Sequence, residues 1–369
     1  MAKFTRFTLI ISGMSMTSRE RVAAALNHRQ PDRTPIFEYV LLSPLADYFL
    51  GHPYAGDPVN WNTLVNETGW EAAVRQNARD RVELAVKLGH DMLYITPNPD
   101  QGETISAALP ARPADDPVAA LQQRNACDAL HTSVPDDTLL VYVFARQEMH
   151  RRGIDLPILA PAYLHGVWTD VELLQSMALD AQVAQRHFQI ATLKALAYIE
   201  KFIALGIEQV GIGGDFAGKR LIISPRAYRT FILPELRLLS ARLHQAGIYA
   251  VNASDGDLWP VIDDFLVSSG VDAYLEIDLH AGMDLRKLKS CFGRQITLFG
   301  NLDCGIELSF GSPDEVRRHT LDCIEAGMGS GGHILCASNA ITASVPLHNY
   351  LVVLAAYRER FTLPAFENV

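Results

Sequence analysis

Five side chains suited to acid, base or metal chemistry stand at or near the ends of short apolar runs. Asp215 follows a glycine-rich run, Asp255 ends the next run along the chain, and Glu276 lies near the end of the one after it. Cys304 ends a later run, and Cys336 lies inside the last one. Carboxylates can bind a substrate or exchange a proton with it. We expect Asp215 and Asp255 to be catalytic; turn formation and loop capping are the alternatives.

Four further residues are candidates for proton transfer or substrate binding. His165 follows the run that contains Tyr163. It could bind or protonate a substrate, and we include it among the catalytic candidates; packing within a loop is the alternative. We expect Glu38, Tyr163 and Asn339 to contact the substrate, since each lies near the end of an apolar run.

Glu276, Cys304 and Cys336 could converge around one metal ion. Zinc accepts thiolate sulfur and carboxylate oxygen, and a catalytic zinc keeps one position open for the substrate. The three residues therefore predict a zinc site. Buried structural cysteines are the alternative, because the chain contains neither CxxC nor HExxH spacing.

The elements that must position these residues are eight short apolar runs separated by stretches of helical length. A brief apolar run without helical periodicity is typical of a buried strand. The runs are 34–39, 91–96, 156–164, 209–215, 248–255, 273–278, 296–304 and 333–339. Eight β-then-α units predict an α/β protein with a (β/α)8 TIM barrel, whose active site lies at the carboxyl ends of the strands.

The remaining sequence predicts one domain with additions to the barrel. Thr17 and Glu20 have the spacing of a capping box, which predicts a helix that begins after a disordered leader, 1–16. A short apolar patch in the leader faintly resembles a signal peptide, but it is too short. The barrel domain covers 17–369. Prolines interrupt 97–155, which predicts a long insertion or lid after strand 2, with an extra strand over 139–144 as one option.

Bulk composition excludes several classes of protein. The net charge is −10 and no long basic run occurs, so nucleic acid is not an expected partner. No apolar run is long enough to span a bilayer. Five cysteines without regular spacing do not suggest a disulfide framework and indicate a reducing, cytoplasmic compartment.

Several segments resemble the uroporphyrinogen decarboxylase superfamily, which includes the methylcobamide methyltransferases. The resemblance covers 17–364, and its most specific segments are 17–35, 224–234, 254–257, 282–289 and 299–303. It implies a TIM barrel. True decarboxylases carry an Arg-Gln-Ala-Gly-Arg stretch after strand 1, where this chain reads FEYVLLS over 37–43. They also carry a histidine where this chain places Asn339.

The resemblance to the methyltransferase branches is also partial. The zinc thiol-methyltransferases use His-x-Cys and a later cysteine, where this chain has Ala253, Asp255 and Asn339. Other corrinoid-linked members, which demethylate methoxylated compounds, have an acid after strand 6 and a cysteine after strand 7. Glu276 and Cys304 match that pattern, and we expect Cys336 to be the third ligand.

The resemblance thus implies a methyltransferase that moves a methyl group from a small methylated donor to a corrinoid. The chain lacks a corrinoid-binding Asp-x-His-x-x-Gly motif, so the cobalamin is expected on a separate corrinoid protein. A metal-free decarboxylase or lyase of the same superfamily is one alternative. A non-catalytic barrel that binds a ligand is another.

Overall fold

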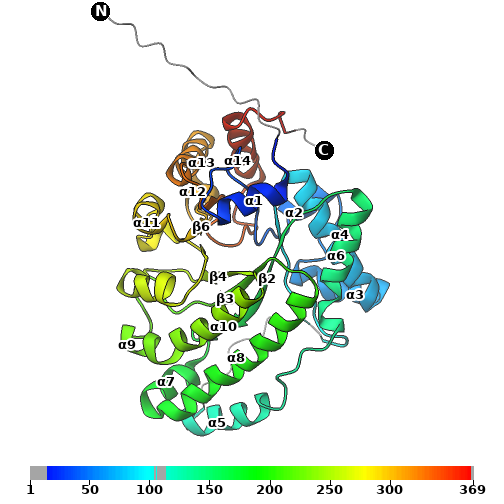
Figure 1. Cartoon of the computed structure of the whole chain (residues 1–369). Helices are drawn as coiled ribbons and strands as arrows, with labels where there is room; N and C mark the ends of the chain where they lie inside the picture. The colour runs from blue at the N-terminus through cyan, green and yellow to red at the C-terminus, as the bar shows by residue number, and fades with distance from the viewer. Residues whose placement is uncertain (1–14, 104, 106–113, 367–369) are drawn as a thin grey trace, which may run out of the picture.

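The computed structural model describes residues 15–103, 105 and 114–366, and it contains a curved, seven-stranded parallel sheet with helices around it (Figure 1). The strands pair in chain order, each with the next. They are β1 Leu93–Tyr94, β2 Ile158–Leu164, β3 Gln209–Gly213, β4 Tyr249–Ala253, β5 Ala273–Leu275, β6 Thr297–Phe299 and β7 His333–Ile334. Each lies inside one of the predicted runs, so the mixed α/β, TIM-barrel-like class is confirmed.

The first predicted run, 34–39, is not a regular strand. It forms one parallel bridge, between Ile36 and Leu335, and the carbonyl of Ile36 accepts the amide of Asp91 at 2.7 Å. The segment therefore lies between β7 and the start of β1. Pairing stops where the Glu38 carboxylate, not a backbone carbonyl, accepts the amide of Ala337 at 3.0 Å. A side chain thus replaces the next bond of the ladder.

Side chains cap the first turn of several helices. Thr17 and Glu20 form the predicted capping box at the first helix, with bonds of 3.2 and 2.9 Å. The α-helices are α1 Ser18–Leu26, α2 Leu45–Leu50, α3 Pro58–Thr68, α4 Trp70–Leu88, α5 Pro117–Asp128, α6 Leu140–Arg152, α7 Val171–Leu179, α8 Ala181–Ala204, α9 Pro225–Ala227, α10 Leu233–Gln245, α11 Leu285–Phe292, α12 Glu307–Phe310, α13 Pro313–Gly327 and α14 Leu347–Arg360. The helices with such caps include α1, α3, α5, α7 and α8. Most of the predicted leader, 1–14, lies outside the described residues.

The described part of 97–155 contains the α-helices α5 and α6 and a short 3-10 helix, Asp137–Leu139. α5 packs against α7 and α8, and α6 packs against α4 (Figure 1). The optional strand over 139–144 is wrong, because these residues begin α6. Glu148 pairs with Arg151 and Arg152 one turn later, which is a helical spacing. The prolines lie outside this helix.

The centre of the sheet is filled by apolar side chains, and a buried ionic network lies at its amino-terminal end. The centre is apolar, and Phe37 and Phe299 meet edge to face at 5.9 Å. Asp91 lies two residues before β1 and is fully buried. It accepts from Arg21 at 2.6 Å and from Arg33 at 2.7 Å, which attaches α1 to the amino-terminal end of the sheet.

Candidate active site

Three carboxylates meet at the carboxyl ends of neighbouring strands. Asp215 follows β3, Asp255 follows β4 and Glu276 follows β5. The backbone amide of Asp255 donates to Asp215 Oδ1 at 2.8 Å. Asn339 Nδ2 donates to Asp255 Oδ2 at 2.5 Å, and the Tyr39 hydroxyl donates to Glu276 Oε1 at 2.7 Å. The same hydroxyl lies 3.1 Å from Asn339 Oδ1, so these five residues form one network, which we call the acidic cluster.

Burial and mutual repulsion keep protons on the acidic cluster. Burial, followed by the charges of Asp255 and Asp215, raises the pKa of Glu276 to about 8. Burial and the neighbouring aspartates raise the pKa of Asp255 to about 7, and burial raises the pKa of Asp215. In the described part of the chain, no Lys, Arg or His nitrogen lies within 4.0 Å of these carboxylates. At neutral pH the cluster can therefore donate a proton.

The backbone around the cluster is unusually close-packed. A Cβ atom on Gly213 would lie 2.6 Å from Asn252 Oδ1 and 2.7 Å from the carbonyl of Ala253, so only glycine fits between β3 and β4. Glu276 has φ of 73°, in the left-handed region that non-glycine residues rarely adopt. Its carboxyl group keeps the bond to Tyr39 in that conformation. Strained residues of this kind concentrate at functional sites.

A cavity of about 150 Å³ adjoins the cluster. Asp215 and Glu276 line it together with Tyr39 and Tyr94, and residues of β2, β3, β4 and β5 supply most of the remaining wall. No Lys, Arg or His belongs to the lining that the described residues form. The cavity therefore offers acid and aromatic surface to a small guest.

His165 and Tyr163 lie beside this site in different ways. Tyr163 lines the cavity, and its side chain is buried. The ring of His165 packs against Phe216 at 6.0 Å, and its Nδ1 accepts the amide of Val167 at 3.3 Å. Burial lowers the pKa of His165 to about 3. This imidazole is neutral at pH 7, so the structure favours the acidic cluster as the proton donor.

Glu38 and Tyr39 are adjacent in the sequence. Glu38 was predicted to contact the substrate, and Tyr39 was not. Glu38 accepts from Ala337, and burial raises its pKa to about 8, but it does not line the cavity at the acidic cluster. Tyr39 lines that cavity and donates a hydrogen bond to Glu276. Consecutive residues of an extended segment point to opposite sides, so a strand end always offers two candidates. Asn339 joins the cluster, as a substrate-contacting residue would.

The predicted zinc ligands do not form a metal site. Cys304 Sγ lies 3.6 Å from the hydroxyl of Ser338, and Cys336 is fully buried in the apolar centre beside Phe299. Throughout the described ranges, no group of three or more His, Cys, Asp or Glu side chains is arranged to hold a metal. Glu276 accepts a hydrogen bond from Tyr39 through Oε1. The residues present therefore do not fit zinc, and we assign no chemical step to it.

The fold and this site define an α/β protein with a parallel, TIM-barrel-like sheet and an acid site at the strand ends. The family model for uroporphyrinogen decarboxylase (URO-D) matches 157–360, more than half of the chain. The chain belongs to the uroporphyrinogen decarboxylase family.

Two known proteins are similar to this chain over most of its length. A uroporphyrinogen decarboxylase from Xylella fastidiosa (strain Temecula1) is 24% identical over 370 residues, covering 93% of this chain and 99% of that protein. The solved structure of a methyltransferase from Methanosarcina mazei superposes with a TM-score of 0.65 at 18% identity, covering 94% of this chain and 99% of that one. The second likeness shows a shared fold. No helix among the described residues is long and apolar enough to cross a membrane.

Proposed function

We propose that this chain is a methyltransferase that moves a methyl group from a small methylated donor to a corrinoid on a separate protein. The observation that carries the proposal is the acidic cluster, whose protonated carboxyl groups lie beside a small cavity with no basic side chain. The methyltransferase with the same fold supports the reaction class. The fold itself we propose to be a complete eight-stranded barrel, which 34–39 closes between β7 and β1.

Glu276 is the proton donor in this proposal. Its carboxyl group lines the cavity, and Tyr39 orients it. As the bond between the methyl carbon and the donor's heteroatom breaks, the electron pair stays on the heteroatom, which takes the proton of Glu276. Glu276 is left as a carboxylate and regains a proton from solvent. Asn339 holds the carboxyl group of Asp255 through a hydrogen bond and also lies 3.1 Å from the Tyr39 hydroxyl that orients Glu276.

A corrinoid would supply the electron pair that forms the bond to the methyl carbon. We propose that it is carried by a separate protein, because this sequence lacks the Asp-x-His-x-x-Gly motif. The cavity of about 150 Å³ beside Glu276 suits the methylated end of a small donor.

A decarboxylase is the second candidate, because the curated relative of nearly equal length carries that name. A tetrapyrrole with eight carboxylates requires several cationic partners. The acidic cluster and its cavity offer none. We therefore rank the decarboxylase below the methyltransferase, and a non-catalytic barrel below both.

Mixing the full chain with reduced cobalamin and a panel of methyl ethers, methylamines and methyl thioethers tests the proposal. We expect the absorbance of methylcobalamin to grow with one class of donor. Glu276→Gln should abolish this growth, while Glu325→Gln, an exposed carboxylate on α13, should not. Release of CO2 from uroporphyrinogen without methyl transfer would establish the decarboxylase instead. Turnover of neither would favour the binding protein.

A further inference from the structure

Arg81, on α4, carries a charge that no carboxylate neutralises. Its Nε donates to Asn77 Oδ1 at 2.8 Å, one Nη to the carbonyl of Tyr94 at 3.1 Å, and the other to Thr96 Oγ1 at 3.2 Å. All three acceptors are neutral. No carboxylate oxygen of the described residues lies within 4.0 Å of the guanidinium. Because a guanidinium has five N–H groups, two of them still have no acceptor among the described residues.

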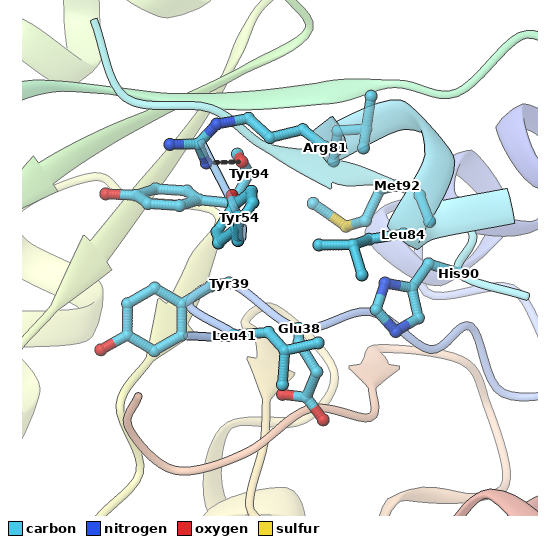
Figure 2. A pocket seen from close by; sticks show the side chains of 11 residues that line it. Glu38, Tyr39, Leu41, Tyr54, Arg81, Leu84, His90, Met92 and Tyr94 are labelled. Atoms are coloured by element: carbon cyan, nitrogen blue, oxygen red, sulfur yellow. Dashed lines mark hydrogen bonds between the residues drawn. The ribbon is translucent and has the colours of Figure 1, made fainter. Parts of the chain in front are cut away.

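Arg81 faces two connected hollows behind the acidic cluster. One, of about 220 Å³, is lined by Arg81 with Tyr54 and Thr96, and the other, of about 40 Å³, by Arg81 with Glu38 and His90. Figure 2 shows Arg81 and Tyr39 on one side of the smaller hollow and His90 on the other. Nε2 of His90 is buried and has no hydrogen-bond partner among the described residues. Buried polar groups normally have partners, so this nitrogen is a second polar group at the hollow, besides Arg81, whose hydrogen bonding is incomplete.

Tyr39 and Tyr94 connect these hollows to the acidic cluster. Both rings line the two hollows and also the cavity beside Glu276. They pack edge to face with their centroids 5.5 Å apart. One face of the pair therefore looks toward Arg81, and the Tyr39 hydroxyl reaches Glu276 on the other side. The two rings are thus the shared wall between the space beside Arg81 and the cavity beside Glu276.

We propose that Arg81 binds the carboxylate of a small organic acid whose opposite end lies beside the acidic cluster. This deepens the proposed function, because it names the donor as a monocarboxylate with its methylated heteroatom at the far end. The two free N–H groups suit a carboxylate, which accepts two parallel bonds from arginine. A single arginine can neutralise a single carboxylate, which is why we propose a monocarboxylate. The Tyr39 and Tyr94 rings provide an apolar wall for the part of the guest between its two ends.

Binding measurements with simple ligands test this site without any methyl transfer. We would titrate acetate, benzoate and 4-methoxybenzoate into the full chain by calorimetry, with benzamide as the neutral analogue of benzoate. At least one carboxylate should bind, and benzamide should bind about tenfold more weakly or not at all, since it lacks the charge. Arg81→Gln should weaken carboxylate binding by about tenfold or more.

Two further variants keep the test decisive. Arg79→Gln removes a charge from an exposed position of the same helix and should leave binding unchanged. Arg81→Lys keeps the charge without the planar fork and should bind with intermediate affinity. Equal affinities for wild type and Arg81→Gln, for benzoate and benzamide, or no binding of any carboxylate would overturn the proposal. If carboxylates bind through Arg81 but no methyl group moves, the methyltransferase reaction fails and this site stands.

Discussion

Buried carboxylates occur at both ends of the sheet, and their surroundings differ. Asp91, at the amino-terminal end, accepts from the guanidinium groups of Arg21 and Arg33 and from the amide of Ile36. The acidic cluster, at the carboxyl end, has no basic side chain within bonding distance in the described structure. At the amino-terminal end, the two guanidinium groups stabilise the negative charge of Asp91 and connect α1 and the residue before the 34–39 segment to the sheet. Their absence at the other end leaves carboxyl groups that hold protons.

The comparison separates stability from chemistry. A buried ion pair is hard to break, because removal of one partner leaves an uncompensated charge. A cluster of unpaired acids is costly to fold and is useful only if it binds or reacts. In parallel barrels, the amino-terminal face serves stability and the carboxyl face catalysis. Substitutions at the two ends should therefore have opposite effects.

The largest effect should follow substitution of Asp91. Asp91→Asn leaves Arg21 and Arg33 without their shared partner in a buried site, which should lower the free energy of unfolding by about 3–5 kcal/mol. Urea denaturation monitored by circular dichroism measures this. Asp263→Asn, at an exposed position, should change it by less than about 0.5 kcal/mol. Equal stability of the two variants would remove the distinction between the two ends.

Glu276→Gln should lower activity and leave stability unchanged, in contrast to Asp91→Asn. Loss of the proton donor should lower the methyl transfer rate by about a hundredfold or more, as is typical of general acids. The free energy of unfolding at pH 7 should not fall, because a neutral amide replaces a carboxyl group that is already protonated at that pH. Stopped-flow absorbance and urea denaturation measure the two quantities. A destabilised variant with normal turnover would show that Glu276 is structural.

The pH dependence should sharpen the contrast further. Burial and like charges raise the pKa of Glu276 from 4.5 to about 8 in the folded chain, so the folded state binds this proton more tightly than the unfolded state. The resulting stabilisation is complete below pH 4.5 and is lost as the pH rises to 8. In wild type this contribution should lower the melting temperature between pH 5 and 8. Glu276→Gln should flatten that slope, and Glu325→Gln should preserve it.

The smallest effect should come from Cys304. Its thiol contacts Ser338 and belongs to no metal site in the described structure, so Cys304→Ser should change stability by less than about 1 kcal/mol. The zinc content measured by elemental analysis should be the same in the variant and the wild type. About one zinc per wild-type chain that disappears in the variant would restore the zinc hypothesis.

The strands and the acids that follow them were largely predictable from the sequence. The apolar runs predicted eight strands, and seven of the runs contain the seven parallel strands of the sheet. Asp215, Asp255 and Glu276 follow three consecutive strands, as predicted, because strand burial is a local property of the sequence. The run at 34–39 was also correct as a segment of the sheet, but not as a regular strand. Glu38 interrupts its pairing through a side-chain bond to Ala337, and no local pattern reports such a bond.

What the sequence determined by itself was the order of the elements, the family and the end of the sheet where the acids lie. Only the tertiary structure decided which side chains share a space. The fold makes Tyr39, and not Glu38, the hydrogen-bond donor to Glu276, arranges no three-ligand metal group among the described residues, and places Arg81 of α4 at the wall of a hollow. The physical reason is that strand and helix periodicities are short-range, whereas burial, pKa and the pairing of charges depend on neighbours that the fold brings from far along the chain.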